Sequence, residues 1–196
     1  RKYSFKDITV WVEPTVFPPF ITISTKLLLE FIEPLDLKGK TFLELGCGCG
    51  IISILAAQKG ALVTATDINQ IALNALEENA KENQVNIEII ESDLFQKIQN
   101  RTFDFVVINP PYYPRKPMSV AENAWFCGEN FEYFESLFSQ LPIYLTIENS
   151  TYMILSEDCE LEKIKAIAFQ NKITFHVEQV TKVLGEVNLI YKLELC

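Results

Sequence analysis

The sequence contains a single histidine, no Cys-x-x-Cys pair, and no apolar run of the roughly 18 residues needed to span a membrane. Cys47 and Cys49 are close together, but the chain offers neither a second close cysteine pair nor further histidines to complete a metal site. The five cysteines are odd in number and irregularly spaced, so they do not predict a disulfide framework. Because no signal peptide opens the chain, we expect a cytoplasmic protein without a metal or a membrane association.

The sequence also lacks a concentrated basic patch. Its formal net charge is −9 and 48% of its 196 residues are hydrophobic. An acidic surface repels phosphate backbones, so binding of nucleic acid would require a local basic region. The length suits one domain, and we expect residues 1–196 to form a single domain. Within it, an N-terminal strand and helix segment (residues 1–40) would pack on a core formed by residues 41–196.

Strand patterns alternate with helix patterns along most of the chain. Residues 3–12 alternate as a strand or short hairpin would, and a helix is predicted to begin with Ser24 or Thr25 as its N-cap and to end before Pro34. Further strands are predicted at 42–45, 62–66, 87–90, 103–108 and 152–155, and helices at 51–59, 71–83, 131–140 and 159–169. Two last strands, 173–183 and 186–195, flank a Leu184-Gly185 turn.

This order predicts an α/β protein. We expect a Rossmann-like, doubly wound and mostly parallel seven-stranded sheet, with helices on both faces and a C-terminal antiparallel hairpin.

A glycine-rich loop lies between the first core strand and its helix. Gly46, Gly48 and Gly50 allow a ligand to approach the backbone closely, and Asp67 ends the next strand, where it can accept hydrogen bonds from ribose hydroxyls. The spacing is GxGxG rather than the GxGxxG of pyrophosphate cofactors. Glu44, inside the strand just before the loop, disfavours a phosphate group. The pattern therefore indicates an adenosine cofactor that carries positive charge.

Two further polar positions follow strands at the same sheet edge. Asp93 can accept a hydrogen bond from an exocyclic amine, or it can cap the turn that follows it. Asn109 comes directly after the buried strand 103–108 and is followed by Pro110, Pro111 and Tyr112. The prolines fix φ and remove two backbone donors, so they would hold the amide and the aromatic ring at the strand end. A simple turn is the alternative for this tetrapeptide.

These motifs together resemble a known family. Leu43–Gly50, Asp67-Ile68 with Asn79-Ala80, Ser92–Phe95 and Asn109–Tyr112 come in the order found in class I S-adenosylmethionine-dependent methyltransferases. The sequence is most similar to the "methyltransferase small" group and, within it, to the release-factor glutamine methyltransferases. The resemblance covers about residues 20–140. It departs where Ser24-Thr25 replaces the family's Asp-Thr and where the N-terminal segment is too short for a separate helical domain.

The resemblance implies S-adenosyl-L-methionine as cofactor and S-adenosyl-L-homocysteine as product. Glu44 would lie near the cationic end of the cofactor, Asp67 would hold the ribose, Ile68 would contact the adenine, and Asp93 would face the adenine amine. The backbone around Cys47 would contact the methionine part. The expected cofactor-binding set is completed by Thr25, Gly46, Gly48, Gly50 and Asn109.

For the methyl acceptor, the resemblance implies a planar nitrogen. Asn109 Oδ1 and the Pro110 carbonyl would accept hydrogen bonds from its NH2 group, next to Pro111, and Tyr112 would pack against the planar group. Fixing the two hydrogens orients the nitrogen lone pair, so catalysis needs no histidine base. His176 is accordingly expected to be structural.

Several substrates and functions remain open at the level of sequence. The favoured acceptor is a protein glutamine side chain, such as that of a translation release factor. The alternative is an exocyclic amine of RNA or DNA, adenine N6 or guanine N2, reached by base flipping or in a single strand. A cofactor-binding scaffold without activity and a dinucleotide dehydrogenase are more remote. Trp125 and Phe126 are expected either to line the pocket or to form a core or lid.

Overall fold

The computed structural model describes residues 1–183 and 185–196. Within these residues the main sheet has seven strands in the order β5-β4-β3-β6-β7-β9-β8. The neighbours from β5 to β7 pair in parallel, whereas β9 pairs antiparallel with both β7 and β8. The predicted mostly parallel sheet with a C-terminal hairpin is thus confirmed. Leu184, in the predicted turn, lies outside the described residues. The strands are β3 (Thr41–Leu45), β4 (Leu62–Asp67), β5 (Glu88–Glu91), β6 (Phe105–Ile108), β7 (Ser150–Ser156), β8 (Ile173–Val183) and β9 (Glu186–Leu195).

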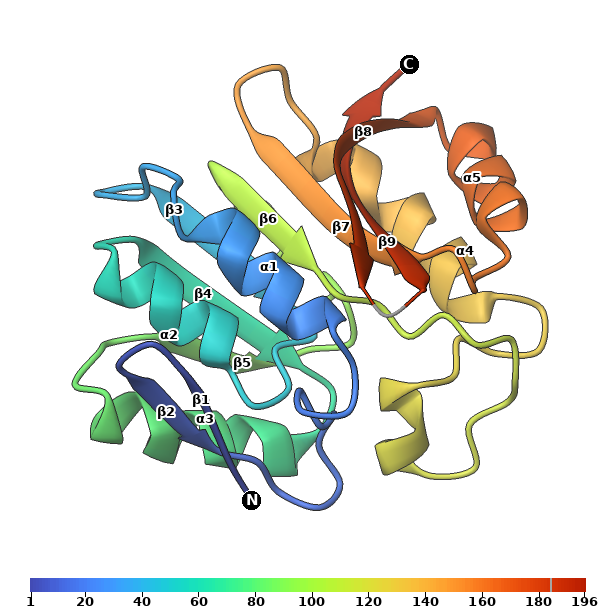
Figure 1. Cartoon of the computed structure of the whole chain (residues 1–196). Helices are drawn as coiled ribbons and strands as arrows, with labels where there is room; N and C mark the ends of the chain where they lie inside the picture. Colours follow the sequence, from blue (N-terminus) through green and yellow to red (C-terminus); the bar gives the residue numbers. More distant parts are fainter. Residues whose placement is uncertain (184) are drawn as a thin grey trace.

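Helices cover both faces of this sheet (Figure 1). Successive strand residues point to opposite faces. Phe42 of β3 therefore belongs to a core cluster with α1 (Ser24–Ile32), α2 (Ile51–Gln58) and α3 (Gln70–Glu82). The next residue, Leu43, belongs to a second cluster with α4 (Glu132–Gln140) and α5 (Leu161–Gln170). Among the described residues, no helix is both long enough and apolar enough to cross a membrane.

An N-terminal hairpin, β1 (Lys2–Phe5) and β2 (Ile8–Trp11), forms a separate two-stranded sheet beside α3. Two asparagines one helical turn apart bind its backbone. Asn79 Oδ1 accepts from Trp11 N at 2.8 Å and Nδ2 donates to Trp11 O at 2.9 Å, and Asn83 pairs with the two backbone groups of Thr9 in the same way. The two amide side chains therefore pair with backbone N–H and C=O groups of β2 that a neighbouring strand would otherwise bind.

Helix α1 begins at Ser24, close to its predicted start, but its predicted N-cap is wrong. Neither Ser24 nor Thr25 is the N-cap, because the helix begins at Ser24, is preceded by Ile23 and has no side-chain cap. Both hydroxyl residues are buried, and Ser24 Oγ instead accepts a hydrogen bond from Asn109 at the end of β6. The other predicted core elements are present with ends shifted by at most two residues. The sequence did not predict the short 3-10 helices η1 (Val120–Ala124) and η2 (Leu141–Tyr144).

Candidate active site

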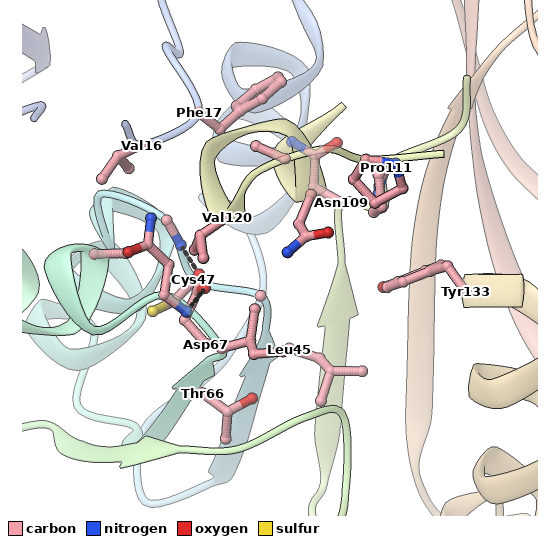
Figure 2. A pocket seen from close by; sticks show the side chains of 18 of the residues that line it. Val16, Phe17, Leu45, Cys47, Thr66, Asp67, Asn109, Pro111, Val120 and Tyr133 are labelled. Carbon is pink, nitrogen blue, oxygen red and sulfur yellow. Dashed lines mark hydrogen bonds between the residues drawn. The ribbon is translucent and has the colours of Figure 1, made fainter. Parts of the chain in front are cut away.

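A cavity of about 620 Å³ lies at the carboxyl ends of β3, β4 and β6. This is the edge at which open α/β sheets bind their ligands, and the volume suits a small-molecule cofactor. Figure 2 shows the cavity with Asp67 and Cys47 on one side and Tyr133 on the other, and with Asn109 reaching into it.

The glycine loop forms one wall of this cavity. The backbone N–H groups of Gly46 and Cys47 both donate to Thr66 O at 2.9 Å, which joins the loop to the end of β4. Gly46 has a φ of +78°, and a Cβ atom added there would meet no other atom within 4 Å. The loop therefore presents bare backbone to open space, where a ligand can contact it.

Asp67 stands at the end of β4, beside this loop. Its Oδ2 accepts from Gly48 N and its Oδ1 from Asn69 N, both at 2.9 Å. Burial raises the pKa of the carboxyl, and these backbone hydrogen bonds partly oppose that effect. Asn69 in turn caps α3 through Ile71 N and donates to Thr15 O, so the carboxylate is fixed between the loop, the helix and the N-terminal segment.

Glu44 is buried in β3 and lines the same cavity. Its carboxyl group accepts from Ser53 N at 2.9 Å and forms a short hydrogen bond with Ser53 Oγ. Burial raises its pKa to about 8, despite the two hydrogen bonds from Ser53. A cation bound beside the group would lower that pKa again, because opposite charge favours the ionised form.

Asn109 follows β6 and extends into the cavity (Figure 2). Its Nδ2 donates to Ser24 Oγ at 3.3 Å, so α1 holds the nitrogen end of the amide. An amide oxygen carries two lone pairs and no proton. With the nitrogen occupied by Ser24, Oδ1 is available to accept a hydrogen bond from a ligand.

The loop after β6 covers the cavity from one side. It is pinned by backbone hydrogen bonds from Tyr113 N to Trp125 O at 3.1 Å and from Cys127 N to Tyr113 O at 2.9 Å. The Trp125 ring lies 4.9 Å from the ring of Phe17, which belongs to the segment before α1. Phe126 lines the cavity, while Trp125 joins the two segments that enclose it.

The structure brings most of the predicted site residues together. Ten of the thirteen line the cavity: Thr25, Glu44, Gly46, Cys47, Gly48, Asp67, Ile68, Asp93, Asn109 and Pro111.

Gly50, Pro110 and Tyr112 lie outside this lining. A Cβ atom on Gly50 would come within 2.1 Å of Leu76 Cδ1, so this glycine allows the close packing of α2 on α3. Pro110 is buried, and Tyr112 packs against the second core cluster.

Sequence reasoning did not single out several cavity residues. Phe17 comes from the proline-rich segment before α1, and Tyr133 comes from α4, where an aromatic residue looks like part of the core. The Pro18-Pro19 break next to Phe17 was the one local signal, whereas nothing in the sequence marked Tyr133. The missed lining residues also include Val16, Asn69, Lys116, Asn123 and Glu132.

Negative charge dominates the cavity. Among the described residues, its lining contains five carboxylic acids and a single lysine, Lys116. Such a lining attracts cations and repels phosphates. The acids are Glu44, Asp67, Asp93, Glu129 and Glu132.

Residues 7–125 match the sequence profile of the family described as "Methyltransferase small domain". This match covers more than half of the chain. The chain belongs to this methyltransferase family. Membership confirms the prediction of an S-adenosylmethionine-dependent methyltransferase with a Rossmann-like fold.

Two proteins with similar sequences have names that refer to different methyl acceptors. A Methanocaldococcus jannaschii protein, provisionally named as a protein N5-glutamine methyltransferase, is 33% identical over 179 residues, covering 86% of this chain and 88% of its own. Ribosomal RNA small subunit methyltransferase C of Haemophilus influenzae is 36% identical over 113 residues, covering 56% of this chain but only 33% of the relative.

A solved structure from E. cuniculi has the same fold. The Mtq2–Trm112 complex, described as responsible for methylation of the eRF1 translation termination factor, has a TM-score of 0.67 at 21% identity. The match covers 93% of this chain and 99% of the matched one. The shared sheet and helices therefore extend over nearly the whole length of both chains.

Proposed function

We propose that this protein transfers a methyl group from S-adenosyl-L-methionine to the side-chain amide nitrogen of a glutamine in a protein, such as a translation release factor. The observation that carries the proposal is Asn109, whose amide nitrogen is bound by Ser24 and whose oxygen is left to accept from a substrate NH2 group. On this proposal residues 1–196 act as one domain, and the enzyme meets its substrate in the cytoplasm.

The cavity fits the proposed cofactor. The open space over Gly46 suits the methionine part, and Asp67, beside Ile68 at the end of β4, suits the ribose and adenine. Asp93 is exposed in the lining, where it can accept from the adenine amine. Five acids against one lysine favour a cation over a dinucleotide. When bound, S-adenosylmethionine supplies an electrophilic methyl group on a cationic sulfur.

Asn109 would act on the acceptor nitrogen. An amide nitrogen is a poor nucleophile because its lone pair is delocalised into the carbonyl group. Accepting a hydrogen bond at Asn109 Oδ1 would hold one of the two hydrogens and help to point the nitrogen at the methyl carbon. Transfer would leave the electron pair of the broken C–S bond on sulfur, so the cofactor would supply the methyl group and Asn109 would orient the nitrogen that accepts it. The positively charged nitrogen then releases one proton to water.

The charge of the chain and the extent of its sequence matches favour a protein substrate. The net charge of −9 and the acidic cavity lining oppose a phosphate backbone. The glutamine-methyltransferase relative matches over nearly its full length, whereas the ribosomal RNA methyltransferase matches over a third of its length. That second relative supports a base amine, adenine N6 or guanine N2, as the alternative acceptor.

Label transfer distinguishes these acceptors. The purified protein is incubated with methyl-tritiated S-adenosylmethionine and a cell extract, which is then separated into protein and nucleic-acid fractions. We expect the label in protein, at glutamine after digestion. Asn109→Ala should reduce transfer by about 100-fold or more, the size of effect seen for a lost transition-state hydrogen bond. It should leave the Kd of S-adenosylhomocysteine within about threefold.

The matched control is Asn171→Ala, which removes an asparagine at the end of α5, outside the cavity lining. This variant should retain full transfer. Label in RNA or DNA would establish the alternative acceptor. An equal loss of transfer and of cofactor affinity in Asn109→Ala would contradict the role assigned to its side chain.

A further inference from the structure

Tyr133 is a polar cavity residue that the mechanism above does not use. It lies in the first turn of α4, where its N–H donates to Cys127 O at 3.0 Å and its ring meets Phe134 edge-on at 5.3 Å between centroids. Figure 2 shows the side chain projecting from α4 with its hydroxyl toward the part of the cavity that contains Asn109. Packing therefore fixes the ring and points its polar end at the open space.

The hydroxyl of Tyr133 is a donor without a partner. Among the residues that the structure describes, it makes no hydrogen bond, although the ring is partly buried. Burial raises the pKa of the phenol, and the nearby carboxylates of Asp67 and Asp93 add to this effect. The group therefore keeps its proton at neutral pH. The hydroxyl is not among the fully buried side-chain atoms that lack a partner, so it borders the open cavity, where a ligand can accept its hydrogen bond.

The proposed acceptor presents the complementary group. A glutamine amide has an NH2 end, which needs acceptors, and a carbonyl oxygen, which needs a donor. Asn109 Oδ1 can serve only the NH2 end. A desolvated carbonyl left without a donor would weaken binding, so the site requires a donor on the other side of the amide. A neutral phenol meets this need without adding charge.

We propose that the Tyr133 hydroxyl donates a hydrogen bond to the carbonyl oxygen of the acceptor amide and so determines specificity for glutamine. This proposal rests on the proposed glutamine N-methyltransferase function. Asn109 would then hold the NH2 end and Tyr133 the oxygen end of one planar group. A side chain of similar length that lacks the carbonyl, such as methionine, could not satisfy the phenol.

Tyr133→Phe tests the proposal, since it removes the hydroxyl and keeps the ring. With a glutamine peptide that the wild type methylates, we expect kcat/KM to fall by about 10- to 100-fold, mainly through a higher KM. The Kd of S-adenosylhomocysteine should stay within twofold. Tyr144→Phe is the matched control. It removes a buried hydroxyl that donates to Ile98 O at 3.4 Å, outside the cavity lining, so kcat/KM should not change.

A second readout separates recognition from a structural role. The Kd of the glutamine peptide and the Kd of its counterpart with methionine in place of glutamine are measured for the wild type and for Tyr133→Phe. We expect the wild-type preference for glutamine to shrink by the same 10- to 100-fold. An unchanged ratio would overturn the proposal, as would a variant whose loss falls on the Kd of S-adenosylhomocysteine. Absence of glutamine transfer in the wild type would instead contradict the proposed function itself.

Discussion

Glu44 is a buried carboxyl group, and its ionisation should change the free energy of unfolding of the protein. It is 5% exposed, and burial raises its pKa from the ordinary 4.5 to about 8. Glu44→Gln keeps the shape and an acceptor for Ser53 while removing the charge. The variant therefore isolates the cost of placing a carboxylate at this position.

The sign of the effect follows from proton binding. Between pH 4.5 and about 8 the folded state holds the Glu44 proton and the unfolded chain releases it. The free energy of unfolding of the wild type should therefore fall as the pH rises through this range. At about 1.36 kcal/mol per pH unit the upper limit is roughly 5 kcal/mol. Water entering the adjoining cavity would reduce this, so we expect about 2–4 kcal/mol.

Urea unfolding without cofactor, at pH 5, 6, 7 and 8, measures the effect. The free energy of unfolding of Glu44→Gln minus that of the wild type should increase steadily from pH 5 to pH 8. The control is Glu148→Gln, a change at an exposed glutamate, whose difference from wild type should not depend on pH in this way. Parallel curves for wild type and Glu44→Gln would refute the reasoning, because they would mean that Glu44 titrates alike in both states.

Two further changes test the supports of the site. Asn79→Ala removes hydrogen bonds to both backbone groups of Trp11 and to Cys49 O, and should lower the free energy of unfolding by about 2–4 kcal/mol in urea titrations. A loss below 0.5 kcal/mol would mean that water replaces these bonds. Asp67→Ala should weaken cofactor binding by about 1–3 kcal/mol, measured by calorimetry with S-adenosylhomocysteine. An unchanged Kd would exclude a ribose contact.

The sheet and its helices could be predicted because local patterns determine them. Residues 105–108 (Phe-Val-Val-Ile) are all apolar and the run breaks at Asn109-Pro110, so the strand and its end at the sheet edge follow from neighbouring residues. The same holds for the loop, because Gly46 directly follows β3, and for Asp67, because it is the last residue of β4. Residues placed by local signals at one sheet edge necessarily approach one another once the strands are parallel.

The two segments that enclose the cavity, one before α1 and one after β6, could not be predicted in the same way. Phe17 meets Trp125 across more than a hundred residues of chain, and neither ring belongs to a periodic pattern. Ser24 or Thr25 was predicted as the helix cap because local rules favour that use of a hydroxyl group. In the structure, the Ser24 hydroxyl instead accepts a hydrogen bond from the amide of Asn109. Long-range hydrogen bonding took precedence over the local preference at this position.

The glycine loop shows how one motif combines two physical requirements. Gly46 and Gly50 have nearly the same φ, +78° and +75°, so both need the left-handed conformation that glycine adopts without strain. Their surroundings differ: a Cβ atom would point into open space at Gly46 and into Leu76 at Gly50. The first glycine leaves room for a ligand and the last brings α2 against α3. A GxGxG pattern thus specifies the path of the backbone, and only the packing around each glycine shows which one faces open space.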